Sequence, residues 1–217
     1  MAGRRSISSL RTAGGVLGWF GVRPRPGQGL RLESGRIYLR RPRDSDFEAW
    51  TSLRAGSREF LAPWEPTWSK DALSRAAFRR RLHQYAEDWR DASGYNFLIF
   101  RAEDDALLGA INLSNVRRGI VQAGTLGYWM GASFTGQGYM TEALQCMLRY
   151  AFDRLELHRV EAACLPHNTA SEALLRKGGL RLEGHARKYL RIDGKWQDHL
   201  IFAILREDRA GASPGPA

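Results

Sequence analysis

A strand-like pattern changes to a helical one within Tyr128-Trp-Met-Gly-Ala-Ser-Phe-Thr-Gly-Gln-Gly-Tyr-Met-Thr-Glu-Ala-Leu144, and the change falls on a glycine-rich turn. Gly136 and Gly138 permit a tight turn whose backbone N–H groups point in one direction. The helix that opens near Tyr139 adds the positive end of its dipole, which is worth about 0.3–1 kcal/mol to a bound anion. The stretch therefore predicts a phosphate-binding turn between a strand and a helix.

Two other nucleotide-binding motifs do not fit this turn. A dinucleotide-binding Rossmann turn needs a third glycine, and Thr141 stands at the required spacing. A P-loop needs Lys and then Ser or Thr after its last glycine, whereas Tyr139 follows Gly138. A plain glycine turn without a ligand remains the alternative.

The composition is that of a globular protein with a basic surface. The chain has 217 residues, 43% hydrophobic content and a net charge of +10. It has no run of about 18 apolar residues that could span a membrane. The charge favours an anionic cofactor, a nucleic acid or an acidic surface without choosing among them. The arginines cluster at residues 40–43, 79–81 and 117–118, where a solvated face is the simpler interpretation.

The two cysteines, Cys146 and Cys164, lie among apolar neighbours and have neither metal-ligand nor redox spacing. We therefore expect them to occupy core positions in a reducing compartment. We also expect the protein to be cytoplasmic and to bind no metal.

We expect one domain over residues 35–207, with a basic, flexible arm before it (1–34) and a disordered tail after it (208–217). The first 30 residues are rich in Arg, Gly and Ser and contain no acid, a composition that transit peptides share. Their apolar run, residues 16–20, is too short for a secretory signal, so a basic arm is the simpler interpretation.

Strand and helix patterns alternate along the domain. Alternating apolar residues and turn signals predict strands at 36–40, 95–101, 107–115, 125–131, 159–165, 188–192 and 196–205. Helices are expected after Asp44 or Ser45, after Ser69, from about Tyr139, and over 169–177. Because a crossover helix separates them, strands 125–131 and 159–165 should be parallel. Asp193-Gly194 predicts a hairpin between the last two strands.

Two helices carry apolar stripes that should face the core. The helix after the glycine turn has Met140, Leu144, Met147, Leu148, Ala151 and Leu155. The helix after Ser69 has Leu73, Ala77, Leu82, Tyr85 and Trp89.

This order of elements, with the Gly-Gln-Gly turn and Asn168-Thr-Ala-Ser171 after the next strand, resembles the GCN5-related N-acetyltransferases over residues 36–206. Within that superfamily the chain resembles the bacterial Rim-type ribosomal-protein-alanine N-acetyltransferases. The strings that carry this resemblance are Phe60-Leu-Ala-Pro-Trp-Glu-Pro66, Asn112-Leu-Ser-Asn-Val-Arg-Arg-Gly119, Leu165-Pro-His-Asn168 and Tyr189-Leu-Arg-Ile-Asp-Gly-Lys-Trp-Gln-Asp-His199. The resemblance implies an α/β (α+β) fold with a mixed sheet of about seven strands flanked by about four helices.

The resemblance also implies acetyl coenzyme A (acetyl-CoA) as the co-substrate. The family's phosphate loop falls on Thr135, Gly138 and Met140, of which only Gly138 matches strictly, so most contacts should come from backbone N–H groups. The pantetheine arm should lie between two splayed parallel strands as a pseudo-strand. The expected cofactor residues are Trp129, Met130, Gly131, Thr135, Gly136, Gln137, Gly138, Tyr139, Met140, Thr141 and Asn168.

The implied reaction is direct attack of an amine on the thioester in a ternary complex, without a covalent enzyme intermediate. Ser171 resembles the serine that protonates the departing thiolate, and a helix-capping role is its alternative. Leu175 stands where many members have a tyrosine acid, which favours Ser171.

Glu65 is our first candidate for the base, acting through water, and a structural loop residue is its alternative. Asp198 and His199 are further candidates in a strand pattern, and Ser114 and Tyr128 could position a peptide.

The leading hypothesis is acetylation of the N-terminal α-amine of a ribosomal protein that begins with alanine or a similarly small residue. About a tenth or more of such amines are neutral near pH 7, against about one in two thousand lysine side chains. One alternative is acetylation of a small-molecule amine. Another is a ribosome-assembly or RNA-binding factor that retains the cofactor fold, in which the basic arm and residues 79–81 contact ribosomal RNA.

Overall fold

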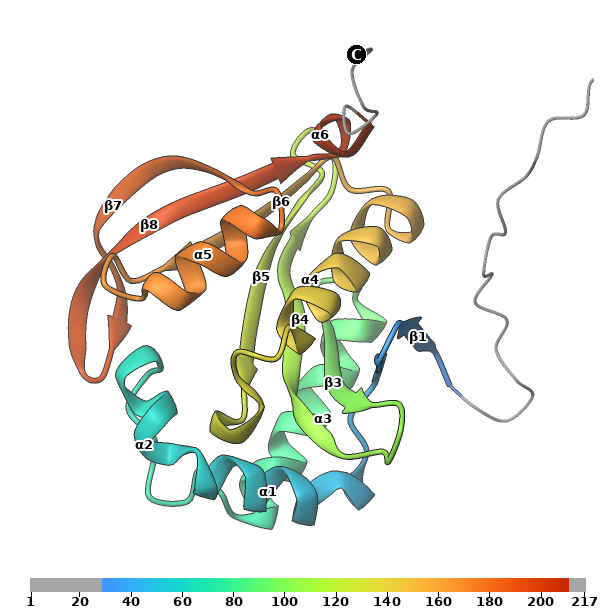
Figure 1. The fold of residues 1–217 in the computed structure, drawn as a ribbon, viewed down its shortest axis with the longest axis vertical. Coiled ribbons are helices and arrows are strands. Elements are labelled where there is room, and N and C mark those ends of the chain that lie inside the picture. Colours follow the sequence, from blue (N-terminus) through green and yellow to red (C-terminus); the bar gives the residue numbers. More distant parts are fainter. Residues whose placement is uncertain (1–28, 211–217) are drawn as a thin grey trace, which may run out of the picture.

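The structure, a computed structural model, describes residues 29–210 as one mixed sheet with helices packed against it (Figure 1). The strands are β1 (Arg31–Ser34), β2 (Ile37–Arg40), β3 (Tyr95–Arg101), β4 (Leu107–Arg117), β5 (Ala123–Met130), β6 (Arg159–Cys164), β7 (Arg181–Ile192) and β8 (Lys195–Leu205). They lie in the order β1-β2-β3-β4-β5-β6-β8-β7. Among these described strands, β5 and β6 form the one parallel pair, as the crossover helix between them predicted.

The helices number six within the described residues. They are α1 (Phe47–Gly56), α2 (Arg58–Leu61), α3 (Arg75–Arg90), α4 (Tyr139–Arg149), α5 (Thr169–Lys177) and α6 (Arg206–Ala210). The expected mixed sheet with flanking helices is confirmed, although it has eight strands where about seven were expected and six helices where about four were expected.

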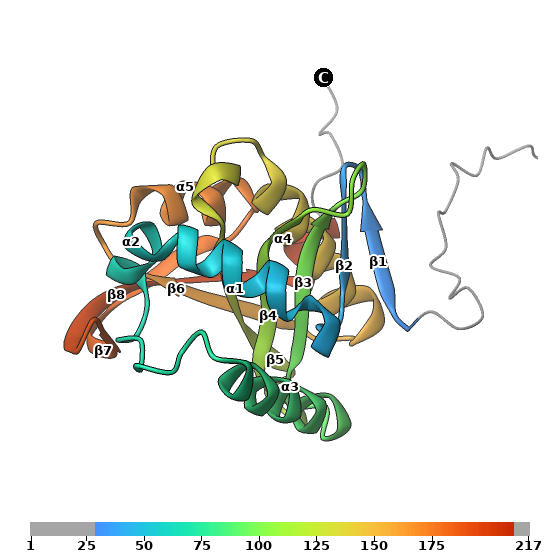
Figure 2. The same cartoon turned by 90° about the horizontal axis from the view of Figure 1, so that it is seen from below.

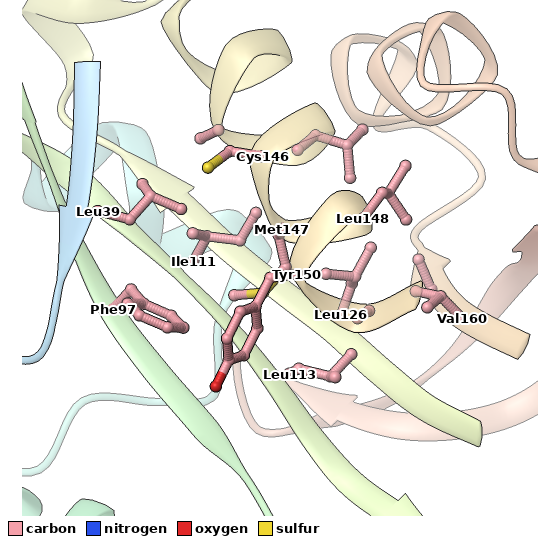
Figure 3. Close-up of a cluster of buried hydrophobic side chains, with 14 of the residues drawn as sticks. Leu39, Phe97, Ile111, Leu113, Leu126, Cys146, Met147, Leu148, Tyr150 and Val160 are labelled. Atoms are coloured by element: carbon pink, nitrogen blue, oxygen red, sulfur yellow. The ribbon is translucent and has the colours of Figure 1, made fainter. Parts of the chain in front are cut away.

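Helix α4 covers one face of the sheet with its apolar stripe, which continues into the helical turn that follows it. Leu144, Met147, Leu148 and Ala151 are fully buried, as expected, while Met140 is only partly buried. Figure 3 shows Met147 and Leu148 packed among residues from five strands, which include Leu39, Phe97, Ile111, Leu113, Leu126 and Val160. Each buried leucine contributes about 1.5–3 kcal/mol, so this cluster anchors the helix that opens at the glycine turn.

Helices α1 and α3 pack against a second apolar cluster, formed by side chains on the other face of the strands. The Trp50 and Phe78 rings lie 4.9 Å apart and contact Tyr38, Leu98 and Phe100. Figure 2 shows α3 on one side of the sheet and α4 and α5 on the other. The sheet is therefore a central layer between two sets of helices.

Helix α3 differs from the expectation in its start and its burial. It begins at Arg75 and not directly after Ser69, since the Ser74 hydroxyl caps it by accepting a hydrogen bond from Ala77 N at 3.1 Å. Of this helix only Phe78 is fully buried, and the expected stripe is half-buried. The reason is that α3 borders a cleft, described below.

The start of α1 also differs from the expectation, because neither Asp44 nor Ser45 caps it. Instead the buried carboxylate of Asp46 accepts hydrogen bonds from Arg43 N at 2.7 Å and from the Arg40 guanidinium at 2.6 and 2.8 Å. The buried Asp46 carboxylate, and not that of Asp44, therefore stabilises the turn before α1.

Two elements at the ends of the described chain fall within the expected arm and tail. Strand β1 falls inside the segment that we expected to be an arm, and α6 overlaps the expected tail. The remainder of both expectations, residues 1–28 and 211–217, lies outside the described residues. Between residues 29 and 210, no helix has the length and apolar character that crossing a membrane would require.

Candidate functional site

Strands β5 and β6 pair over only part of their length. Their register runs from Ala123 opposite Arg159 to Leu126 opposite Ala162 and then stops. Strand β6 continues to Cys164 by pairing with β8, while β5 continues to Met130 by pairing with β4. Within the described residues, one backbone edge of 127–130 is therefore left for an extended ligand that adds to the sheet as a strand does.

The glycine turn lies just beyond this edge and opens α4. Gly136 and Gly138 have φ angles of +73° and +85°, which side-chain-bearing residues rarely adopt. Gly138 is the N-cap of α4, and no side chain of the described residues caps the helix. The N–H groups of the first helical residues, Tyr139, Met140 and Thr141, have no partner within a helix. They are the groups that an anion can bind.

Two side chains of the glycine turn form hydrogen bonds to backbone carbonyl groups just before it. The Thr135 hydroxyl donates to Ala132 O at 2.9 Å, and the Gln137 amide donates to Ser133 O at 2.9 Å. Among the expected cofactor residues, these two therefore fix the turn's shape, and the backbone is left to meet a ligand.

The start of α5 meets β5 through a hydrogen bond between two hydroxyl groups. The Tyr128 and Ser171 oxygens lie 2.6 Å apart, and Asn168 Oδ1 caps the helix by accepting from Ser171 N at 3.0 Å. Asn168, and not Ser171, is thus the helix cap. Burial raises the pKa of the Tyr128 phenol to about 12, although the hydrogen bond with Ser171 lowers it. Leu175 is fully buried.

A cleft of about 730 Å³ lies on the α1–α3 side of the sheet. Its walls come from α1, the segment 65–73, α3 and strands β3 to β5, and include Trp50, Arg54, Glu65, Trp68, Tyr85, Asn112 and Trp129. Successive side chains of a strand point to opposite faces, so Trp129 reaches this cleft while Tyr128 reaches Ser171. Strand β5 therefore joins the two halves of the site.

Glu65 is held on the wall of this cleft by three donors. The Arg54 guanidinium donates to both carboxylate oxygens at 2.7 and 2.6 Å, and Trp68 Nε1 donates at 2.8 Å. Arg54 itself lies between two rings, 4.3 Å from the centroid of Trp68 and 4.8 Å from that of Trp129. A carboxylate has about four acceptor positions, so Glu65 keeps about one for a ligand or water.

The segment that carries Glu65 also contacts the loop between β6 and α5. The Trp64 and His167 rings lie 5.4 Å apart, and His167 directly precedes the cap residue Asn168. The tip of the β7–β8 hairpin joins it, since Asp193 N donates to Glu65 O at 3.0 Å. Glu65 and Ser171, distant in sequence, therefore belong to segments in direct contact.

Arg54 was not among the expected site residues. Nothing in the spacing of α1 distinguishes it from a solvated arginine, yet it is only 9% exposed. Tyr128 was expected only as a positioning residue, and its hydrogen bond to Ser171 links residues 43 positions apart.

The further base candidates on β8 have structural partners. His199 is buried, its Nδ1 lies 3.1 Å from Gln197 O, and burial holds its pKa below the usual value. Asp198 accepts from Lys188 N at 2.9 Å. On β4, the Ser114 hydroxyl donates to Thr125 O at 3.3 Å.

Two arginines of the run at 79–81 form ion pairs. Arg79 pairs with Asp44 at 3.0 Å and Arg80 with Asp71 at 2.5 Å. Arg81 lies 5.6 Å from the centroid of the Trp50 ring. Across residues 29–210, no three His, Cys, Asp or Glu side chains gather as metal ligands would.

Comparison with known proteins places these features in a family. The acetyltransferase (GNAT) domain matches residues 36–181. A probable N-acetyltransferase of Bacillus subtilis, YjcK, is 36% identical over 82% of this chain and 98% of its own length. The [ribosomal protein uS5]-alanine N-acetyltransferase of Escherichia coli is 35% identical over 82% of this chain and 92% of its own. The solved structure of Mycobacterium smegmatis RimJ in complex with CoA-disulfide is 34% identical, covers 79% of this chain and 83% of its own, and has a TM-score of 0.75.

We expect the Tyr128 phenol to stay protonated at about pH 10.5, where a free tyrosine is mostly ionised. The measurement is a pH titration by NMR with tyrosine labelled at Cζ, and Tyr128→Phe identifies the signal. Ser171→Ala should raise this pKa further, because it removes a hydrogen bond that lowers it. A midpoint near pH 10 for the Tyr128 signal would contradict this environment.

Proposed function

Because this chain belongs to the GNAT acetyltransferase family and is therefore an acyltransferase, we propose that it acetylates the N-terminal amine of a ribosomal protein beginning with alanine or a similarly small residue. Tyr128 and Trp129 carry the proposal, because these neighbours on β5 face a hydroxyl donor on one side of the sheet and an open cleft on the other. A thioester and an amine that approach from the two sides would meet at this strand.

Acetyl-CoA is the proposed co-substrate, and it supplies an acyl group already activated as a thioester. The residues fit it: the first N–H groups of α4 suit the diphosphate, and the free edge of residues 127–130 suits the amide-bearing pantetheine arm. The CoA compound named with the RimJ structure supports this assignment. The contacting residues would be Trp129, Met130 and Gly131 at the arm and the turn 135–141 at the phosphates, with Asn168 beside the arm.

The acceptor would occupy the cleft on the α1–α3 side. Its walls carry aromatic side chains, and Glu65, which accepts hydrogen bonds from Arg54, is the one carboxylate among its described lining residues. Three donors already bind Glu65, which leaves its carboxylate about one acceptor position for an amine or a water. An N-terminal α-amine, already partly neutral near pH 7, needs less help than a lysine side chain. The acceptor named for the E. coli relative supports a ribosomal protein beginning with alanine.

Glu65 would then act on the attacking amine, and the Ser171–Tyr128 pair on the departing sulfur. Glu65 orients the amine or its proton-accepting water through its remaining acceptor position, as the C–N bond forms and the C–S bond breaks. Ser171 donates to the departing sulfur, and Tyr128 donates in turn to Ser171. A thiol has a pKa of about 8.5, so full proton transfer from a phenol of pKa about 12 is uphill by about 5 kcal/mol. The pair therefore stabilises the thiolate by hydrogen bonding, and solvent supplies the final proton.

The acceptor can be tested by thiol release from acetyl-CoA with short peptides beginning Ala, Ser or Met, a lysine peptide with a blocked N-terminus, and free amino acids. We expect release with the Ala and Ser peptides at least about tenfold faster than with the blocked peptide, because their amines are far less protonated. Release with free amino acids alone would favour the small-molecule alternative. CoA binding without release from any acceptor would favour the non-catalytic one.

Ser171→Ala should lower kcat by about 10- to 100-fold, because the departing thiolate loses its donor. The CoA dissociation constant, measured by calorimetry, should stay within about twofold. Thr169→Ala, at an exposed position in the same helical turn, is the matched control and should leave both quantities unchanged. A variant at Ser171 that turns over like the wild type would remove this residue from the mechanism.

Glu65→Gln should lower kcat/KM for the peptide by about tenfold while CoA binding stays unchanged, since the residue lies on the acceptor side. If Glu65 acts as a base, the fall should be in kcat. If it only holds the amine, KM should rise. Glu59→Gln, exposed on the neighbouring helix α2, is the control, and equal effects of the two changes would argue against both roles.

A further inference from the structure

Arg36 connects three parts of the chain at the glycine turn. It stands with Gly35 in the two-residue turn between β1 and β2, where Ser34 pairs with Ile37. Its Nη2 donates to Gln137 O at 2.9 Å, and its guanidinium also donates to the Glu142 carboxylate at 2.8 and 2.5 Å. Thus one side chain ties the β1–β2 hairpin both to the turn and to the first turn of α4.

The contact with Gln137 O fixes the direction of the next N–H group. A trans peptide is planar, so the carbonyl of Gln137 and the N–H of Gly138 point to opposite sides. The described chain contains no cis peptide. Because Arg36 holds the carbonyl, the Gly138 N–H points away from Arg36.

That N–H then joins the first N–H groups of α4. Gly138 is left-handed, with φ +85° and ψ −6°, and Tyr139 begins a right-handed helix. Consecutive residues of opposite hand turn their N–H groups into one concave nest that binds anions. The nest comprises the N–H groups of Gly138, Tyr139 and Met140. A rotated Gln137–Gly138 peptide would remove one of the three.

The local charges favour a geometric role over direct attraction. Glu142 takes three hydrogen bonds from Arg36, including one from its backbone N at 3.0 Å, so the two charges offset each other. Without Arg36, the Glu142 carboxylate would stand uncovered in the first helical turn, where it would repel a bound phosphate. Arg36 also packs closely against the turn: any residue with a side chain at position 138 would place its Cβ 3.2 Å from Arg36 Nη2.

We infer that Arg36 is a positioning residue for the diphosphate of CoA, because it orients the Gly138 N–H toward the anion and neutralises Glu142. This role rests on the proposed use of acetyl-CoA. It belongs to a residue about 100 positions before the turn in sequence, outside the expected cofactor residues.

The test compares CoA with pantetheine, which has the arm but no phosphate, by NMR titration of the full chain. Arg36→Met should weaken CoA binding by at least about tenfold, the loss expected for one hydrogen bond to a charged group, and leave pantetheine binding unchanged. Arg36→Lys should weaken CoA binding nearly as much, since one ammonium nitrogen cannot replace the planar fork that bridges Gln137 and Glu142. The variant Arg149→Met is the matched control, because Arg149 joins the same hairpin to the same helix through Ser34 at 3.0 Å, away from the turn.

Distinct outcomes would overturn the role. CoA binding that is unchanged in Arg36→Met would exclude it, and so would wild-type affinity in Arg36→Lys, which would show that charge alone suffices. Equal losses for CoA and pantetheine would show general damage to the fold in place of positioning. If the wild type bound neither ligand, the proposed function itself would fail, and this role with it.

Discussion

The divergence of β5 and β6 after Leu126 is the constraint on which the rest of the site depends. Beyond that residue, β6 turns its hydrogen bonds to β8 and β5 keeps only β4. Backbone groups that face a gap in a sheet must find water or a ligand, because leaving them without partners costs about 1–3 kcal/mol each. The protein thus keeps an edge that an extended, amide-bearing molecule can complete, and the glycine turn stands at the end of that edge.

Strand β5 also connects the two halves of the site. Because side chains alternate along β5, Tyr128 and Trp129 lie on opposite faces although they are neighbours in the chain. Tyr128 is hydrogen-bonded to Ser171 at the start of α5, and Trp129 flanks Arg54, which pairs with Glu65. A shift of β5 by one residue would exchange these two faces. The packing of α4 on β2 to β6 prevents such a shift, since it buries a continuous apolar stripe (Figure 3).

Features that follow from local chemistry could be predicted from the sequence, and contacts between distant side chains could not. Asp193 and Gly194 adopt positive φ angles, as their residue types suggest, and they form the expected hairpin. Strand β1 escaped prediction because Arg31-Leu-Glu-Ser34 has a single apolar residue, and its pairing with β2 holds it in place. The Arg54–Glu65 ion pair and the Tyr128–Ser171 hydrogen bond join residues 11 and 43 positions apart, and no spacing rule encodes such distances.

The placement of the hydroxyl groups bears on how a thiolate could leave this site. The resemblance implies a tyrosine acid on α5, but Leu175 is buried there, and the phenol that contacts Ser171 is that of Tyr128 on β5. Burial of the Tyr128 phenol keeps it protonated far above neutral pH. Such a donor cannot be lost by ionisation under the conditions in which an α-amine becomes neutral and reactive. The arrangement therefore permits both requirements, a neutral nucleophile and a protonated donor, to be met at the same pH.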